Sequence, residues 1–303
     1  MRPASPLLEI RDLHVAYRRR FRPAAPVLRG ISLSIGAGET LGLVGESGSG
    51  KTTIGRVILG QIPATRGAVI FDGEDITRAT RARRRALGRD IQVVFQDPYG
   101  SLNPARTIGQ TLAEPLSGDS RLGAGEVQAR IAAILNKVGM PADTAARYPG
   151  QFSGGQRQRI AIARALIGEP RLVVCDEPVS ALDLSVQAQV LNLLNQLQRD
   201  MNLSLLFISH DLTVVRHVSH RTIVLYRGEI VEEGEAAAIH DAPRHPYTKA
   251  LVAAAPVPDP VVQRARRALW RAGRDGHGGP AAAAGANGAP GPVEHERRFH
   301  ERF

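Results

Sequence analysis

Short apolar segments recur along the chain and are separated by longer segments with helical spacing. Strands are predicted where apolar and polar residues alternate, or where a short run is continuously apolar, at 7–17, 31–35, 40–45, 68–73, 91–96, 171–178, 204–210, 221–226 and 229–234. Helices are predicted where apolar residues recur every three or four positions, at 50–60, 108–139 and 184–200. Strands that alternate with helices indicate an α/β fold with a mainly parallel sheet.

The segments between these elements add detail to the pattern. Residues 18–26 are basic and contain proline, which predicts a hairpin tip, and the last two strands predict a second hairpin around Arg227 and Gly228. The apolar run at 171–178 ends in acids, as expected for a central parallel strand that is covered on both faces. Beyond residue 259 the chain becomes rich in Arg, then in Gly, Ala and Pro, which predicts disorder.

The composition excludes several classes of protein. With 43% hydrophobic and 22% charged residues among 303, the chain has the composition of a soluble globular protein of one large or two ordinary domains. No stretch reaches the about 18 apolar residues of a membrane span, and the first ten residues lack the apolar core of a secretion signal. The single cysteine, Cys175, excludes an intramolecular disulfide and an all-cysteine metal site. We therefore expect a cytoplasmic protein.

The net charge of +10 invites a nucleic-acid interpretation. Lysine supplies only Lys51, Lys137 and Lys249 of the 39 basic residues, and this arginine bias beside abundant Ala, Gly and Pro is typical of a GC-rich genome. The charge is concentrated at 18–22, at 78–89 and in the last forty residues. We expect these clusters to be solvated loops and a tail, and expect no nucleic-acid partner. A basic edge that faces anionic lipid stays open.

The sequence Gly-Glu-Ser-Gly-Ser-Gly-Lys-Thr at 45–52 matches the P-loop pattern between a predicted strand and a predicted helix. Its glycines allow a tight loop whose N–H groups point at one centre, and the following helix adds its positive N-terminal end. In this pattern Lys51 reaches the β- and γ-phosphates, and the hydroxyl of Thr52 binds Mg²⁺. A glycine-rich turn without a ligand is the alternative, but the context favours a nucleoside-triphosphate site.

Two acids at the end of the apolar run supply the second half of such a site. Asp176 is positioned to bind Mg²⁺ or its water shell, and Glu177 to polarise an attacking water. Acids at strand ends also serve solubility, so this interpretation depends on the P-loop that precedes them.

The segment Ser153-Gly154-Gly155-Gln156 resembles the signature motif of the ATP-binding-cassette (ABC) ATPases, with Phe152 where leucine is usual. Taken alone, it could be an ordinary helix cap. Four further features resemble that family in its order along the chain: Tyr17 resembles the aromatic that stacks on adenine, Gln96 the Q-loop glutamine, residues 180–183 the D-loop, and His210 the switch histidine. The resemblance covers residues 7 to about 260.

This resemblance implies a P-loop NTPase cassette of the α/β class, with a RecA-like core, an antiparallel β subdomain and an α-helical subdomain. The expected divisions are the N-terminal part of the core with the β subdomain at 1–95, the Q-loop and helical signature subdomain at 96–168, the C-terminal part of the core at 169–238, a C-terminal extension at 239–262 and a disordered tail at 263–303.

The resemblance also implies that two cassettes pair head to tail, so that the signature motif of one faces the γ-phosphate held by the other. ATP would then close the dimer and hydrolysis would reopen it. The implied nucleotide-binding residues are Tyr17, Gly45, Glu46, Ser47, Gly48, Ser49, Gly50, Lys51, Thr52, Thr53, Ser153, Gly154, Gly155, Gln156 and Asp183. The implied catalytic residues are Glu177, His210 and Gln96, and the implied Mg²⁺ ligands are Thr52, Gln96 and Asp176.

Two segments narrow the resemblance to the ATPases of oligopeptide and dipeptide importers. Residues 93–104 closely resemble their Q-loop, and residues 245–251 with 256–260 resemble their C-terminal extension. One type of subunit in these importers has a C-terminal cysteine cluster, whereas this chain, with Cys175 alone, resembles the cysteine-poor type. The implied function is a separate ATPase subunit at the cytoplasmic face of the membrane, which pairs with a second ATPase subunit, docks on permease subunits and indirectly serves a solute-binding protein.

Several alternatives stay open. Nickel, glutathione or sugar importers use similar ATPase subunits, and a regulatory ABC ATPase would move no solute. A kinase or GTPase on the same P-loop would have no use for residues 153–156. The sequence also leaves open whether the ATPase subunits form a homodimer or a heterodimer, and whether one or both composite sites hydrolyse ATP. The chain also departs from the family at Thr52, where serine is usual, and at 149–151, where His-Glu is common.

Overall fold

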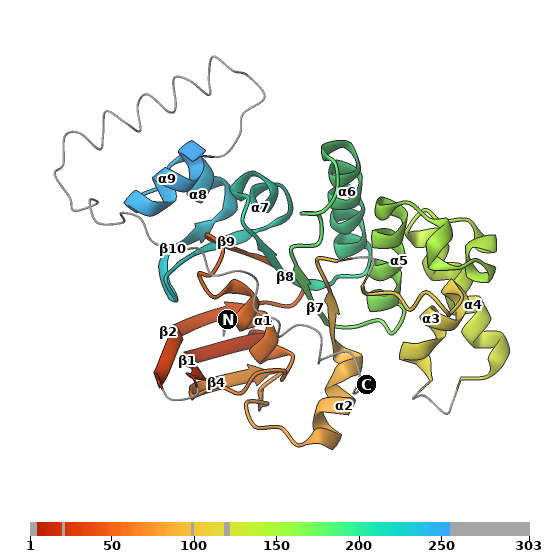
Figure 1. Ribbon diagram of the computed structural model, residues 1–303, viewed down its shortest axis with the longest axis horizontal. Helices are drawn as coiled ribbons and strands as arrows, with labels where there is room; N and C mark the ends of the chain where they lie inside the picture. The colour runs from red at the N-terminus through yellow and green to blue at the C-terminus, as the bar shows by residue number, and fades with distance from the viewer. Residues whose placement is uncertain (1–4, 20–21, 98–99, 118–121, 255–303) are drawn as a thin grey trace, which may run out of the picture. The chain divides into compact units, whose positions relative to one another are not determined.

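Two β-sheets organise the computed structural model, which describes residues 5–19, 22–97, 100–117 and 122–254 (Figure 1). The expected tail at 263–303, and residues 255–262 of the expected extension, lie outside the described residues. All described residues belong to one unit, Met1–Pro256. The sequence pattern predicted the mainly parallel sheet, the family resemblance implied the antiparallel one, and the strand order and register come from the structure.

The first sheet is antiparallel, with strand order β2–β1–β4–β5. It consists of β1 (Leu8–Arg19), β2 (Arg22–Ile35), β4 (Arg66–Phe71) and β5 (Glu74–Asp75). The alternation in β1 changes phase between Ile10 and Leu13, which are both buried although they are three residues apart. A bulge with Asp12 at a φ of 46° lies between them and keeps both side chains on the core face. The hairpin predicted around residues 18–26 is present, since Arg19 pairs with Arg22, but β2 begins at Arg22, so much of the segment expected to be the tip is strand.

The second sheet has six strands in the order β10–β9–β3–β8–β7–β6. Its members are β3 (Thr40–Val44), β6 (Ile91–Val94), β7 (Leu172–Asp176), β8 (Ser204–Ser209), β9 (Arg221–Tyr226) and β10 (Glu229–Glu235). All neighbours are parallel except β10, which pairs antiparallel with β9 at the edge and forms the predicted hairpin. The predicted, mainly parallel sheet is therefore confirmed.

The helices of the described ranges are α1 (Lys51–Ile58), α2 (Arg81–Asp90), α3 (Ile108–Ala113), α4 (Ala124–Lys137), α5 (Gly154–Leu166), α6 (Leu184–Asp200), α7 (Leu212–Val218), α8 (Ala236–Asp241) and α9 (Pro246–Ala254). Of these, α1 packs on one face of the parallel sheet, and α6 and α7 pack on the other. Short 3₁₀ turns are found at Glu114–Leu116, Ala142–Ala146 and Pro149–Gln151. In Figure 1, α3, α4 and α5 gather on one side, away from the antiparallel sheet and α1. None of the helices in the described ranges is long and apolar enough to cross a membrane.

Two hydrophobic cores lie on opposite faces of the parallel sheet, and β7 contributes to both. Val173 and Cys175 belong to the core beside the helices, whereas Leu172 and Val174 belong to the core that α1 shares with the antiparallel sheet. A strand whose successive side chains are all buried needs apolar residues on both faces, which explains the continuous run in the sequence. Cys175 fills this core as predicted, and burial raises the pKa of its thiol to about 12.

The arginine cluster at 78–89, expected in a loop, instead forms most of helix α2. Arginine is a good helix former, and the side chain of Thr80 caps the helix by accepting the N–H of Arg83. Arg84 is not solvated charge either, because its half-buried guanidinium donates to the carbonyl oxygens of Ile58 and Ile76. The expectation of a solvated loop was wrong because it rested on the charge of the arginines and left out their helix propensity.

Candidate nucleotide-binding site

The P-loop connects β3, a central strand of the parallel sheet, to helix α1. Gly45 lies so close to the adjacent strand that a Cβ atom would be 2.1 Å from the carbonyl oxygen of Leu225, so only glycine fits. Gly48 has a φ of 81° in open space, where an L side chain would be strained. The N-terminus of α1, which begins at Lys51, points its unpaired N–H groups at the loop.

Lys51 is buried and folds back onto the loop that precedes it. Its ammonium Nζ donates to the carbonyl oxygens of Gly45, at 2.6 Å, and Glu46, at 2.9 Å. Burial lowers the pKa of Lys51, and the negative charges of Glu177, Asp176 and Glu46 offset part of that effect. A desolvated cation held only by carbonyl oxygens is ready to pair with an anion.

Thr52 and Asp176 come together at the carboxyl end of the parallel strands. The hydroxyl of Thr52 donates to a carboxylate oxygen of Asp176 over 3.0 Å, although the two residues are 124 positions apart. Burial raises the pKa of Asp176, and the hydrogen bond from Thr52 opposes this. A hydroxyl and a carboxylate placed side by side are oxygen ligands of the kind that Mg²⁺ accepts together with phosphate oxygens. The two predicted ligands therefore fit the ion.

Glu177 and His210 form the second predicted pair. A carboxylate oxygen of Glu177 lies 3.2 Å from Nδ1 of His210, which follows the neighbouring strand β8. Glu177 has a φ of 50°, an uncommon value for a residue with a side chain. Its N–H donates to the carbonyl oxygen of Ile208, which stabilises that conformation at the sheet edge. Gln96 follows β6, which pairs with β7, so it lies at the same edge, with its side chain exposed.

Tyr17 lies at the P-loop helix, as predicted for a base-stacking ring. It is in β1, its side chain is 40% exposed, and its hydroxyl is 3.5 Å from that of Thr53 in α1. An exposed aromatic ring beside the phosphate loop can stack on a flat ligand. The structure therefore brings Tyr17, residues 45–53, Asp176, Glu177 and His210 to one edge of the molecule.

The signature residues lie elsewhere. Ser153 begins helix α5 as its N-cap: its hydroxyl accepts the N–H of Gln156, and the Gln156 side chain accepts the N–H of Ser153. Gly155 packs against α6 so closely that a Cβ atom would be 2.3 Å from Val186. In Figure 1, α5 and α1 lie apart, and none of the hydrogen bonds of Ser153 within the described ranges reaches the P-loop. The residues that resemble the signature motif are thus also the cap of helix α5, so the two interpretations of this segment are compatible.

Asp183, predicted as a nucleotide ligand, is also a helix cap. Its carboxylate accepts the N–H of Val186 at 3.0 Å and the hydroxyl of Ser185 at 2.7 Å, at the start of α6. The hydrogen bond from the Val186 N–H is the main reason why the pKa of Asp183 is lowered. The next residue, Leu184, is 85% exposed.

Two residues with contacts to this region escaped the sequence analysis. The hydroxyl of Tyr247, in α9, accepts the N–H of the P-loop residue Glu46. Arg164, in α5, is half-buried and donates to the carbonyl oxygen of Ser101 in the segment that follows Gln96. An arginine inside the otherwise apolar stretch 160–166 of α5 is a signal that could have indicated Arg164. No local pattern could have connected Tyr247 to a loop 201 positions away.

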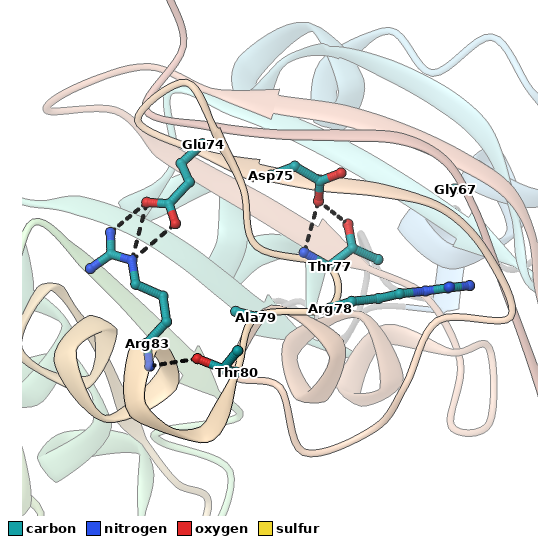
Figure 2. A pocket seen from close by; sticks show the side chains of 8 residues that line it. All are labelled: Gly67, Glu74, Asp75, Thr77, Arg78, Ala79, Thr80 and Arg83. Atoms are coloured by element: carbon teal, nitrogen blue, oxygen red, sulfur yellow. Dashed lines mark hydrogen bonds and ion pairs between the residues drawn. The ribbon is translucent and has the colours of Figure 1, made fainter.

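A polar hollow beside α2 is a separate feature. It is lined by Gly67, Glu74, Asp75, Thr77, Arg78, Ala79, Thr80 and Arg83, none of which is a predicted site residue (Figure 2). Glu74 pairs with Arg83, and Asp75 accepts two hydrogen bonds from Thr77. These groups satisfy one another at the surface between α2 and the antiparallel sheet.

A phosphate loop after a central parallel strand, with a buried lysine and with carboxylates at the end of another strand of the same sheet, defines a P-loop nucleotide-binding domain. A family model described as ABC transporter matches residues 28–180, and one described as oligopeptide/dipeptide transporter, C-terminal region, matches residues 231–276. The chain belongs to the ABC transporter family, among the ATP-binding proteins that carry this C-terminal region, and it is an ATPase of that family, as predicted.

Individual relatives support this family assignment. The chain is 50% identical to the oligopeptide transport ATP-binding protein OppF of Salmonella typhimurium over 270 residues, which are 86% of this chain and 81% of that protein. It is 47% identical to the glutathione import ATP-binding protein GsiA of Escherichia coli K12, over 87% of this chain and 43% of that protein.

Solved structures confirm the predicted cassette fold. The dimeric ATP-binding cassette MJ0796, in a post-hydrolysis state bound to ADP and Pi, matches with a TM-score of 0.68 at 29% identity, over 76% of this chain and 98% of that one. The cbiO1 protein of Clostridium perfringens matches with a TM-score of 0.70 at 24% identity, over 78% and 91% of the two chains, which concerns the fold alone.

Proposed function

We propose that this chain binds ATP with Mg²⁺ at residues 45–53 and hydrolyses it to power an importer, most plainly one for oligopeptides. The single observation that carries the nucleotide site is the meeting of the buried Lys51 with the Thr52–Asp176 pair at the sheet edge. Lys51 would exchange its carbonyl partners for the β- and γ-phosphates, and Tyr17 would stack on the adenine. Bound Mg²⁺ would be held by Thr52 and Asp176, with Gln96 beside them, and would neutralise phosphate charge.

Hydrolysis would use the carboxylate of Glu177. In this proposal it accepts a proton from the water whose oxygen attacks the γ-phosphorus, while the bond to the β–γ bridging oxygen breaks and ADP leaves with the electron pair. His210, which is 3.2 Å from Glu177, orients that carboxylate and contacts the γ-phosphate. Gln96 lies at the end of the adjacent strand and would sense the metal and the water.

The active site would be completed by a second ATPase subunit. Ser153 is exposed and Gly154 is half-buried at the start of α5, where the helix presents N–H groups that suit an anion, yet α5 lies away from the P-loop helix of its own chain. Head-to-tail pairing would bring them, with Gln156 and Asp183, to the partner's nucleotide. The 85% exposed Leu184 beside Asp183 supports an interface there. The match to a dimeric cassette is a further support.

An importer is supported by the relatives and by the C-terminal region. OppF is named for oligopeptide transport, and the matched region at 231–276 is described by the same class of solute. GsiA is named for glutathione import, so glutathione, a small peptide-like solute, is the alternative cargo. The exposed rings of Phe95 and Tyr148, near Gln96 and Ser153 in the sequence, suit docking on a permease at the cytoplasmic face of the membrane.

The variant Glu177→Gln tests the proposed hydrolysis. It keeps the size of the side chain but removes the basic oxygen, so ATP should bind as in the wild type while turnover falls roughly 100- to 10,000-fold. The measurement is phosphate release at saturating ATP beside an equilibrium ATP titration. The closed dimer should accumulate, as judged by its mass in solution.

Glu169→Gln is the matched control, because Glu169 is an exposed acid in the turn before β7. It should hydrolyse ATP at the wild-type rate. Wild-type turnover by Glu177→Gln would refute the role given to that carboxylate.

Uptake of a labelled tripeptide, compared with uptake of glutathione, by the assembled transporter in vesicles tests which solute is transported.

A further inference from the structure

The C-terminal helix α9 reaches the P-loop through one side chain, Tyr247. The hydroxyl of Tyr247 accepts the N–H of Glu46, with 2.9 Å between oxygen and nitrogen. Its ring packs on that of Tyr226, at the end of β9, with 4.2 Å between the centroids and 38° between the planes. The ring contact and the hydrogen bond together fix the position of this hydroxyl.

The three residues His245, Pro246 and Tyr247 each have a distinct part in presenting that hydroxyl. Nδ1 of His245 accepts the N–H of Tyr247 and so caps the first turn of α9. Pro246 is the first residue of the helix, where it lacks an N–H that would need a partner. The carboxylate of Glu232, in β10, accepts the N–H groups of Arg244, at 2.7 Å, and His245, at 3.0 Å. The start of α9 is thereby anchored to the sheet.

The backbone of Glu46 connects Tyr247 to the lysine of the site. While its N–H donates to Tyr247, its carbonyl oxygen accepts Nζ of Lys51 at 2.9 Å and the N–H of Ser49 at 3.2 Å. Further along the loop, the carbonyl oxygen of Ser49 accepts the N–H of Gly228, in the β9–β10 hairpin. Two contacts from other elements therefore hold the loop, that of Tyr247 with Glu46 and that of Gly228 with Ser49. The contact with Tyr247 is the nearer of the two to the carbonyl oxygens that accept Lys51.

We propose that Tyr247 is a positioning residue of the nucleotide site, which holds the first turn of the P-loop in shape before ATP arrives. A glycine-rich loop loses conformational freedom when it closes on phosphate, and a contact that orders it beforehand reduces that cost. Tyr247 acts through the Glu46 peptide and touches neither the nucleotide nor the water. Its loss should therefore weaken ATP binding more than it slows the chemistry. This inference rests on the proposed ATP site.

The test compares Tyr247→Phe with Tyr226→Phe in the full-length chain. Tyr247→Phe keeps the ring pair and removes only the hydroxyl that accepts from Glu46. Tyr226→Phe removes the hydroxyl of the other ring, which has no hydrogen-bond partner among the described residues. ATP affinity is measured by equilibrium titration, and KM and kcat are measured in the assembled transporter. Thermal unfolding without nucleotide reports on folding.

Loss of one hydrogen bond should raise the Kd and KM for ATP of Tyr247→Phe about three- to tenfold. Its kcat should stay within about twofold of the wild type, because the reacting groups are untouched. Tyr226→Phe should match the wild type in all three. Equal ATP affinity of Tyr247→Phe and wild type, or a fall confined to kcat, overturns the inference. A wild-type chain that binds no ATP would instead overturn the proposed function.

Discussion

The P-loop region and the signature region differ in how far the chain prepares each of them. Around the P-loop, the functional groups contact one another across long sequence separations: Thr52 with Asp176, Glu177 with His210, and Glu46 with Tyr247. Around the signature motif, the hydrogen bonds of the Ser153 and Asp183 side chains among the described residues cap α5 and α6, and Gly155 packs against Val186 of α6. Long-range hydrogen bonds assemble the first region, whereas helix capping and helix packing arrange the second.

This difference has a physical consequence. The P-loop region holds a desolvated lysine and a carboxylate whose pKa burial raises, both of which an ATP–Mg²⁺ complex would relieve. In the signature region, the side chains of Ser153 and Asp183 already cap α5 and α6. We therefore expect the first region to respond to ligand in the isolated chain, and the second to respond only when a partner subunit supplies the nucleotide.

The largest expected effect separates the two regions directly. Lys51→Ala should abolish ATP binding by the isolated chain, whereas Ser153→Arg should leave that binding within about twofold of the wild type. In the assembled transporter both should lower turnover roughly 100-fold or more, because each removes groups that face the transferred phosphate. Equilibrium titration and phosphate release make the two measurements.

Ala37→Arg is the control for the added charge, since Ala37 is an exposed residue in the turn before β3. It should bind and hydrolyse ATP normally. If Ser153→Arg weakened binding in the isolated chain as strongly as Lys51→Ala, the two regions would not be independent, and the comparison would fail.

A smaller effect concerns Arg164, a half-buried arginine that links the signature helix to the segment after Gln96. Arg164→Met removes the guanidinium that donates to the carbonyl oxygen of Ser101 and should lower the free energy of unfolding by about 1–3 kcal/mol. Urea denaturation measures it. Arg83→Met, which breaks only an exposed pair with Glu74, is the control and should leave the urea midpoint nearly unchanged. Equal midpoints for the two variants would contradict the structural role of Arg164.

The smallest expected effect is on thermal stability, whose dependence on pH should have opposite signs for Asp176 and Asp183. The pKa of Asp176 is raised in the folded chain, so its ionised form costs stability at neutral pH, and this cost vanishes as the pH falls below about 4. Without nucleotide, Asp176→Asn should therefore unfold at a higher temperature than the wild type at pH 7. The two should converge at about pH 4.

Asp183 should behave in the opposite way. Its pKa is lowered, so its carboxylate stabilises the fold at neutral pH, and this contribution is lost as the pH falls through the lowered pKa. Asp183→Asn should be less stable than the wild type at pH 7, with a difference that disappears in acid. Unfolding temperatures of both variants across this range check the contrast, and shifts of the same sign at pH 7 would refute it.

Much of the fold could be predicted because its signals are local. The buried strands are continuous apolar runs, the P-loop is a contiguous pattern, and the hairpin at Arg227 and Gly228 follows from its turn residues. Helix α2 was missed because its arginines were considered as charge, although their helix propensity and the cap at Thr80 were both in the sequence. The bulge at Asp12 was equally hidden, since a phase change in alternation becomes visible only against a partner strand.

The sequence by itself determined which residues form the phosphate loop, which strand carries the acids and which helix begins with a serine cap, because each depends on neighbours within a few positions. The tertiary structure alone decided that Thr52 meets Asp176, that Arg164 reaches Ser101, and that the hydroxyl of Tyr247 lies on the P-loop. Those contacts arise from strand order and helix docking, where burial of apolar faces brings together residues with no local relation.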